Sequence, residues 1–273
     1  MNLIFRSLHL DWQMALLPMP LGRKLEFYFK KYWVLAKNIL VGHTTTKSYV
    51  KLFGEKYYYD DKFGIAFLQS VYVDHYDLAR HVPQGGVVID IGANIGQFNF
   101  FSRNELKASA VYSFEPIKET FEVLKLNAEK NIYNLGIASD ASEQIFYMPE
   151  TSLMASSCKA GNNLKEIKVK CTRLDEMPEL CNLKSIQLVK IDTEGSELDV
   201  VKASTSILRH AEFALIEASV ARESAGDVVE LTSYMRQCLP ELKLIWIGRH
   251  FDSDVGTTMA VDYLFRNDGM KAN

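Results

Sequence analysis

Closely spaced glycines and acidic residues follow two apolar segments of the chain. Asp90 lies within the apolar run 87–91, Gly92 and Gly96 come after it, and the next apolar run ends at Glu115. Glycines after a buried strand let the backbone turn sharply and approach a ligand without a Cβ in the way. An acid at the end of the neighbouring strand can accept hydrogen bonds from ribose hydroxyls. These residues therefore predict a cradle for a nucleotide-containing cofactor.

The spacing of the two glycines separates the candidate cofactors. Binding of a dinucleotide through its pyrophosphate uses the pattern G-x-G-x-x-G, whereas three residues stand between Gly92 and Gly96. An acid-x-Gly-x-x-x-Gly loop instead resembles the first motif of S-adenosylmethionine (SAM) methyltransferases. Two alternatives stay open: an NAD-dependent oxidoreductase or epimerase with the same strand geometry, and a methyltransferase-like domain that binds without catalysis.

A second group of acids follows two further apolar segments. Asp192 and Glu194 come after the run 185–191, and Glu217 ends the run 213–216. Because the carboxyl ends of parallel strands lie at one edge of a sheet, we expect these acids beside the cofactor. Methyl transfer to a hydroxyl needs a base that removes the proton. We predict Asp192 as that base or as an orienting group, with Glu194 and Glu217 as further catalytic residues. Three carboxylates could also gather a divalent cation, but these acids include no Asp-x-Asp pair, and we predict no metal.

Alternating strand and helix segments must position these residues. This alternation predicts an α/β fold with a mostly parallel, seven-stranded Rossmann-like sheet and helices on both faces, ended by an antiparallel hairpin. The expected strands are 87–91, 110–114, 132–138, 185–191, 213–216, 242–247 and 260–265. We also expect helices over 68–82 and 228–238, and a hairpin of 145–148 with 167–171 around a polar loop, 149–163. A single histidine on a helix, such as His75, favours a packing role.

The first 56 residues differ in charge from the rest of the chain. They contain nine Lys and Arg against three Asp and Glu, and we predict a helical N-terminal extension followed by a catalytic domain over 57–273. Aromatic residues alternate with lysines around 25–37. Such a helix suits peripheral contact with anionic lipid or with a lipid-linked substrate. The interpretation that we favour is a helix packed on the main domain or on a second subunit of a homo-oligomer.

Composition excludes several classes of protein. The 273 residues carry a net charge of −3, and the part after residue 56 is acidic, so no basic field favours nucleic acid as a partner. The opening segment is interrupted by Arg6, Asp11 and two prolines and is too short an apolar run to span a membrane. Four cysteines without a C-x-x-C pair indicate reduced thiols. We therefore expect a cytoplasmic enzyme whose basic segment can contact a membrane surface.

In the order and spacing of five motifs the chain resembles the FkbM family of SAM-dependent methyltransferases. The motifs are residues 89–96, 114–116 with 124–127, 137–140, 173–175 and 189–197. The resemblance implies a class I methyltransferase fold, SAM as cofactor, and O-methylation of a hydroxyl on a saccharide, a glycolipid precursor or another secondary metabolite. The cofactor-binding residues that we predict are Asp90, Gly92, Ala93, Asn94, Gly96, Glu115, Pro116, Ser139 and Asp192.

Overall fold

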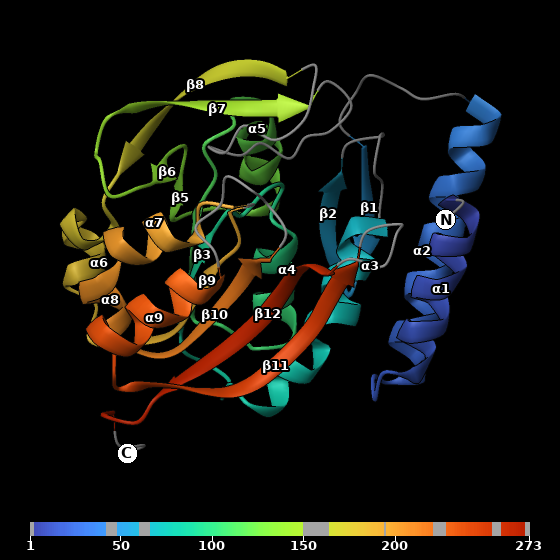
Figure 1. The fold of residues 1–273 in the computed structure, drawn as a ribbon. Coiled ribbons are helices and arrows are strands. Elements are labelled where there is room, and N and C mark those ends of the chain that lie inside the picture. Colours follow the sequence, from blue (N-terminus) through green and yellow to red (C-terminus); the bar gives the residue numbers. More distant parts are fainter. Residues whose placement is uncertain are drawn as a thin grey trace.

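The structure is a computed structural model of the chain (Figure 1). It describes residues 3–41, 48–59, 66–149, 164–193, 195–220, 228–252 and 258–270. Two parts of the predicted site lie outside these ranges: the candidate catalytic residue Glu194, and the polar loop from residue 150 to residue 163.

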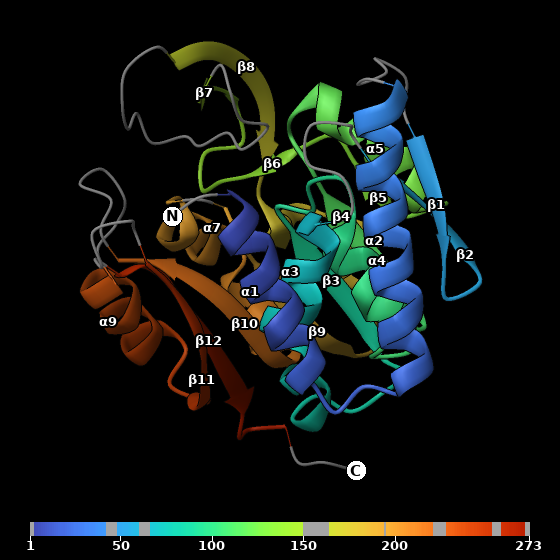
Figure 2. The same ribbon diagram turned by 90° about the vertical axis from the view of Figure 1, so that its right-hand side faces the viewer.

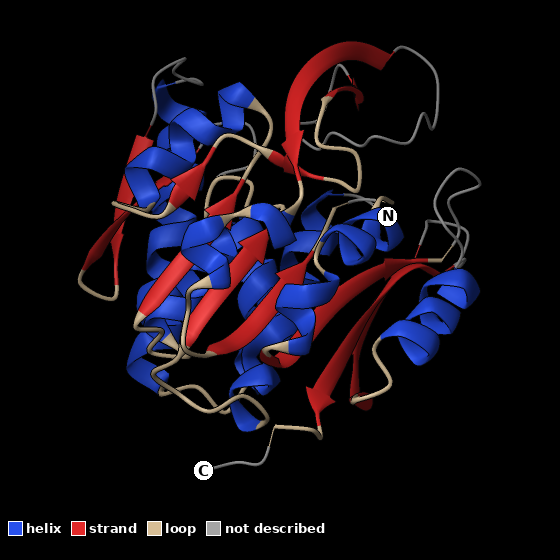
Figure 3. Ribbon diagram, turned by 90° about the vertical axis from the view of Figure 1, so that its left-hand side faces the viewer, coloured by secondary structure: helices blue, strands red, loops and turns tan. Residues whose placement is uncertain are grey.

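A seven-stranded sheet forms the centre of the molecule (Figure 3). Its order is β11-β12-β10-β9-β3-β4-β5, and β12 alone runs antiparallel to its neighbours. The strands are β3 (Val87–Ile91), β4 (Ala110–Phe114), β5 (Ile132–Tyr133), β9 (Ile186–Ile191), β10 (Ala211–Ser219), β11 (Leu242–Asp252) and β12 (Thr258–Asn267). This arrangement confirms the predicted mostly parallel, Rossmann-like α/β sheet with a closing antiparallel hairpin.

Helices cover both faces of the sheet, and side-chain alternation along each strand divides the core between them. Val88 and Leu188 pack into the cluster under α3 (Ala66–His75), α4 (Gln97–Asn104) and α5 (Lys118–Asn127). Ile89 and Val189 point to the opposite face, toward four other helices. Those helices are α6 (Pro178–Cys181), α7 (Glu197–Ala203), α8 (Thr205–Arg209) and α9 (Val228–Cys238). A strand buried on both faces usually reads as a continuous apolar run. All six residues of β9 are buried, although Gln187 and Lys190 interrupt its apolar sequence.

Among the described residues, the helical part of the N-terminal segment extends from Leu3 to Val41. Helices α1 (Leu3–Leu16) and α2 (Leu21–Val41) form an outer layer, which lies in front of the other elements in Figure 2. Strand β1 (Ser48–Leu52) then pairs with β2 (Glu55–Tyr59), so the helical prediction is wrong for 48–56. The reason is local: both turn residues, Phe53 and Gly54, have positive φ, as the favoured two-residue hairpin turn requires.

These N-terminal elements share the main hydrophobic core. Met14, Phe27 and Leu52 belong to the same buried cluster as Tyr72 and Phe101. The predicted division at residue 56 stays a prediction about domains; the packing is continuous across it. In the described part of the chain, no helix combines the length and the apolar character that a membrane span needs.

Two other predicted elements differ in detail. The expected strand 132–138 is divided into β5 and β6 (Gly136–Ile137), and β6 joins a separate three-stranded sheet with β8 (Leu164–Thr172) and β7 (Glu143–Pro149). A Cβ on Gly136 would lie 2.8 Å from Cys171 Sγ, so the close approach of β6 to β8 depends on this glycine. The expected helix 68–82 is α-helical to His75 and continues as a 3₁₀ helix, η1 (Tyr76–Arg80).

Candidate active site

The glycine loop after β3 is held against the ends of both neighbouring strands. The N–H groups of Gly92 and Ala93 donate to the Phe114 carbonyl of β4 at 3.1 and 2.9 Å. On the other side, a Cβ on Gly92 would lie only 1.8 Å from the Asp192 carbonyl oxygen, and Gly92 has φ +80°. Both features restrict this position to glycine. The loop is therefore fixed between β4 and β9.

Glu115 is buried and bridges the loop to the segment after β4. One carboxylate oxygen accepts the Asn94 N–H at 2.9 Å and the other accepts the Ile117 N–H at 2.8 Å. Burial raises the pKa of Glu115 to about 7, against the lowering effect of these two hydrogen bonds. The acid predicted to bind ribose thus also orients the cofactor loop, and each oxygen keeps a second lone pair for a ligand donor.

Asn127 fixes the far end of the same loop, and the sequence analysis assigned it no role. Its Nδ2 donates to the Ile95 carbonyl at 2.7 Å and to the Tyr58 carbonyl at 2.8 Å, and its Oδ1 accepts the Tyr58 N–H at 2.7 Å. Gly96, with φ +93°, allows this contact because a Cβ there would lie 3.3 Å from Asn127 Cβ. The signal available in the sequence was an asparagine at the end of an otherwise amphipathic helix.

A buried lysine joins the acids of β3 and β9. Lys190 Nζ donates to Asp192 Oδ2 at 2.8 Å and lies 3.7 Å from Asp90 Oδ1, and Asp90 is fully buried. Although burial by itself lowers it, the carboxylates of Asp192 and Asp90 raise the pKa of Lys190, which stays cationic. Burial raises the pKa of Asp90 to about 6 against the effect of Lys190. A lysine inside an apolar strand needs such partners, which is the signal that could have identified it.

A row of acids continues across the carboxyl end of the sheet. Asp192 follows β9, Glu217 lies on β10, and Asp262 on β12 is the cross-strand partner of Glu217. The Asp192 side chain is 25% exposed, whereas Asp262 is almost completely buried. Of Asp192 and Asp262, Asp192 is therefore the acid that a substrate can reach. The sequence analysis assigned Asp262 no role, and the signal available was an acid inside the predicted apolar strand 260–265.

His75 on α3 contacts Asp262, the buried acid of this row. Its Nδ1 is 3.1 Å from the Val71 carbonyl, which can only accept, so Nδ1 carries the proton and Nε2 is the unprotonated nitrogen. Nε2 lies 3.5 Å from Asp262 Oδ2. Burial and the nearby Lys190 lower the pKa of His75 to about 4. Burial, with Asp192 and Asp74, raises the pKa of Asp262 to about 8. At neutral pH the pair thus consists of a neutral imidazole and a protonated carboxyl.

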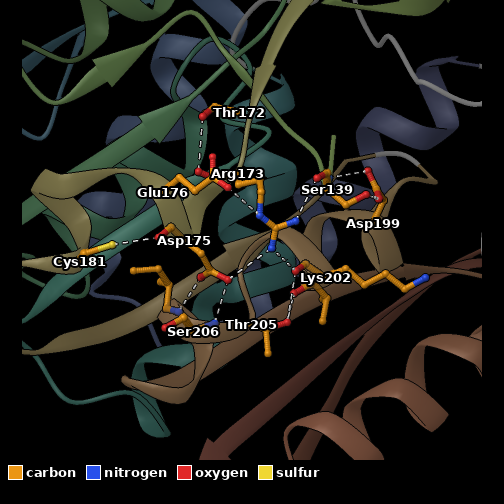
Figure 4. A network of polar contacts seen from close by, with 12 residues as sticks. Ser139, Thr172, Arg173, Asp175, Glu176, Cys181, Asp199, Lys202, Thr205 and Ser206 are labelled. Carbon is orange, nitrogen blue, oxygen red and sulfur yellow. Dashed lines mark hydrogen bonds and ion pairs between the residues drawn. The ribbon is translucent and has the colours of Figure 1, made fainter. Parts of the chain in front are cut away.

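Ser139 belongs to a network beside α7 (Figure 4). Its hydroxyl and N–H donate to Asp199, and its carbonyl accepts from Arg173. Arg173 also donates to the Lys202 carbonyl, while Asp175 accepts the N–H of Ser206 and Ile207 at the start of α8. The motif 173–175 therefore ties the β6–β8 segment to α7 and α8. Contact of Ser139 with a cofactor stays a prediction.

The structure brings most of the predicted residues to one edge of the sheet. Asp90, Gly92, Glu115 and Asp192 are linked through the contacts described above, and Glu217 lies one strand further along. Ala93 and Asn94 lie in the loop, and half-buried Pro116 follows Glu115.

This edge contains a buried acceptor that is available to a donor group of a ligand. Neither carboxylate oxygen of Asp90 receives a hydrogen bond from the described residues, although both are buried. A buried acceptor without a donor is costly, so an ammonium or hydroxyl donor on a ligand would satisfy it. A metal is less well provided for: in the described ranges no three His, Cys, Asp or Glu side chains are grouped to hold one.

Comparison with known proteins places the chain in a family. It is 29% identical over 161 residues to "Methyltransferase 1" of Beauveria bassiana, which covers 49% of this chain and 64% of that protein. It is 25% identical over 159 residues to the hexuronic acid methyltransferase AglP of Haloferax volcanii, which covers 57% of this chain and 65% of that protein. The chain thus spans slightly less than two thirds of both relatives. A methyltransferase FkbM structure from Methylobacillus flagellatus is 16% identical with a TM-score of 0.43, over 72% of this chain and 52% of that one. The methyltransferase FkbM domain model matches residues 90–242, more than half of the chain, and the protein therefore belongs to the FkbM-domain family of methyltransferases.

Proposed function

We propose that the protein transfers the methyl group of SAM to a hydroxyl oxygen of a saccharide, a glycolipid precursor or another secondary metabolite. The observation that carries the proposal is the fixed glycine loop, with Glu115 bound to one side of it and Asp192 packed against the other. A cofactor in this loop would lie between an acid suited to ribose and an accessible acid suited to the acceptor.

The residues of the loop and its two flanking acids would hold the cofactor. Glu115 would accept the ribose hydroxyls, and Asp90 would receive a donor from the amino-acid part. The loop from Gly92 to Gly96 would lie along the adenosyl group, with Pro116 at the adenine side. When bound, SAM supplies an electrophilic methyl carbon on a sulfonium. The protein must then align an alcohol, and alignment alone is worth about 7–11 kcal/mol in favourable cases.

Asp192 is the proposed base or orienting group for the acceptor hydroxyl. Lys190 holds one of its oxygens at 2.8 Å, so the carboxylate is directed rather than free to rotate. Glu217 lies on the next strand and would contact further hydroxyls of the acceptor. Glu194, which lies outside the described residues, keeps its proposed assisting role from its position two residues after Asp192.

Two observations support the acceptor class and the compartment. The similar Haloferax volcanii protein is named for a hexuronic acid, which supports a saccharide. Cys171, Cys181 and Cys238 are unpaired within the described ranges, which supports a reducing compartment such as the cytoplasm.

Ligand binding and turnover test the proposal separately. Thermal unfolding is measured with SAM, S-adenosylhomocysteine and NAD; we expect stabilisation by the first two and none by NAD. Glu115→Ala should weaken SAM binding at least ten-fold, whereas Glu119→Ala, on the exposed side of α5, should leave it unchanged. Asp192→Asn should abolish methyl transfer from radiolabelled SAM to fractionated acceptors while SAM still binds. Stabilisation by NAD alone would refute the cofactor, and full turnover by Asp192→Asn would refute the base.

A further inference from the structure

The outward side of α1 and α2 exposes an unusually large apolar surface. Of the 19 large hydrophobic residues that are exposed in the described part of the chain, 11 lie between residues 8 and 40. We call these residues the outer face: Leu8, Trp12, Leu16, Leu21, Leu25, Phe29, Tyr32, Trp33, Leu35, Ile39 and Leu40. Soluble monomers seldom expose contiguous apolar patches of this kind unless the patch contacts a partner or a membrane.

Helical spacing places these residues on one side of each helix. On α2, Leu21, Leu25, Phe29 and Trp33 recur every four residues, which keeps them on one face. Phe27 and Val34 point the other way and are buried in the core. The exposed side is therefore the side that packing on the main domain leaves uncovered. Both helices lie in front of the remaining elements when that side faces the viewer (Figure 2).

On α1 the same division holds. Leu8, Trp12 and Leu16 are exposed at four-residue steps, and Met14 is buried. Gln69 of α3 donates to Asp11 at 2.8 Å, and Arg23 of α2 pairs with Glu105 at 2.6 Å. The two helices are thus anchored to the domain through their inner sides, and the outer face points away from the domain.

Charge around the outer face is cationic. The described helices contain two acids, and both already have partners: Asp11 accepts from Lys31 at 2.7 Å and from the hydroxyl of Tyr32, and Glu26 accepts the Phe53 N–H at 2.9 Å. Lys30 and Lys37 border the apolar stripe instead, and Lys37 is exposed. The outer face is therefore an apolar and aromatic stripe with a border of lysines.

We infer that the outer face docks on the surface of a bilayer that contains anionic phospholipid. Tryptophan, tyrosine and lysine together are typical of helices that lie in the membrane interface. The 21 residues of α2 extend about 30 Å, enough to lie along that interface. A second copy of the chain fits less well, because an isologous contact would gather the lysine borders of both copies around one interface, where like charges repel. The inference is independent of the proposed methyl transfer.

Vesicle sedimentation with the full chain tests this inference. We expect binding to vesicles of phosphatidylcholine with phosphatidylglycerol, binding that weakens as salt rises, and a blue shift of tryptophan fluorescence. Vesicles of phosphatidylcholine alone should bind at least ten-fold less. Lys30→Glu with Lys37→Glu should remove the preference for the anionic lipid.

Matched variants separate the outer face from general hydrophobicity. Phe29→Glu with Trp33→Glu should reduce vesicle binding at least ten-fold, whereas Leu244→Glu, an exposed apolar position on β11, should not change it. Circular dichroism checks that each variant folds. Vesicle binding that survives the outer-face variant overturns the inference. A second result would also overturn it: light scattering shows a dimer of the native protein, the outer-face variant dissociates this dimer, and the native protein does not bind vesicles. The outer face would then be a subunit interface.

Discussion

Replacement of Lys190 by methionine tests how the buried acids of the site are held. Lys190 Nζ lies 2.8 Å from Asp192 and 3.7 Å from Asp90, and its side chain is 6% exposed. Methionine fills a similar volume and removes the charge. The substitution leaves Asp90 fully buried without its cation, and Asp192 loses the donor that orients it.

The expected cost is large because the surviving charge is buried. Breaking a buried ion pair from one side typically costs about 3–5 kcal/mol, a large part of the total of about 5–15 kcal/mol that stabilises an ordinary domain. An exposed pair provides the matched control. Lys168 lies 3.1 Å from Glu143 with side chains 74% and 53% exposed, and Lys168→Met should cost at most about 1 kcal/mol.

Urea unfolding followed by circular dichroism measures both free energies of unfolding. A further variant, Lys190→Met with Asp90→Asn, should recover part of the loss because no charge then remains on Asp90. Methyl transfer should fall in Lys190→Met even where the protein is folded, since Asp192 is no longer oriented. An equal cost for the Lys190 and Lys168 substitutions would refute the reasoning, as would a double variant less stable than Lys190→Met.

Three further predictions concern the loop and the row of acids. Gly92→Ala places a Cβ 1.8 Å from the Asp192 carbonyl oxygen, at a residue with φ +80°, so the loop must move. Calorimetry should then show at least a ten-fold loss of SAM affinity, and unchanged affinity would contradict the role of the loop. Asn127→Ala removes three hydrogen bonds and should lower the free energy of unfolding by about 1–3 kcal/mol; a loss within error would show that they contribute nothing. The pKa of Asp262, about 8 in the native state, exceeds the usual value near 4. Between about pH 4 and 8 the native state therefore keeps a proton that the unfolded chain has lost, and this contribution to stability falls as pH rises. Asp262→Asn should flatten the dependence of the free energy of unfolding on pH, measured by urea titrations. The lowered pKa of His75 acts at more acidic pH, below about 6.5. An unchanged pH dependence in Asp262→Asn would refute the raised pKa of Asp262.

The sequence predicted the elements whose signals are local. The apolar run before Gly92, the acid at Glu115 and the alternation of strands with helices each depend on neighbouring residues, and all three recur in the structure. Helix α9 has the expected bounds, Val228–Cys238. The placement of Asp192 and Glu217 at one edge also followed, because the connectivity of parallel strands brings their carboxyl ends together.

Contacts between distant segments could not be predicted in this way. Asn127 binds Tyr58 across 69 positions of the chain. His75 of α3 meets Asp262 of β12 only because the fold places that helix against the sheet. Gly92 must be glycine because the Asp192 carbonyl lies where a Cβ would be, a constraint that appears only when β3 and β9 are side by side.

The N-terminal segment shows the same difference between what local sequence predicts and what tertiary contacts decide. The sequence predicted a helical extension with aromatic residues and lysines around 25–37, but this pattern did not say which side packs on the domain. The tertiary structure turns Phe27 and Val34 inward and leaves Phe29 and Trp33 exposed. Local patterns determine which elements form, because each depends on neighbouring residues. Burial depends on what the rest of the chain covers, and therefore only the folded protein decides which charges are paired and which surfaces stay open.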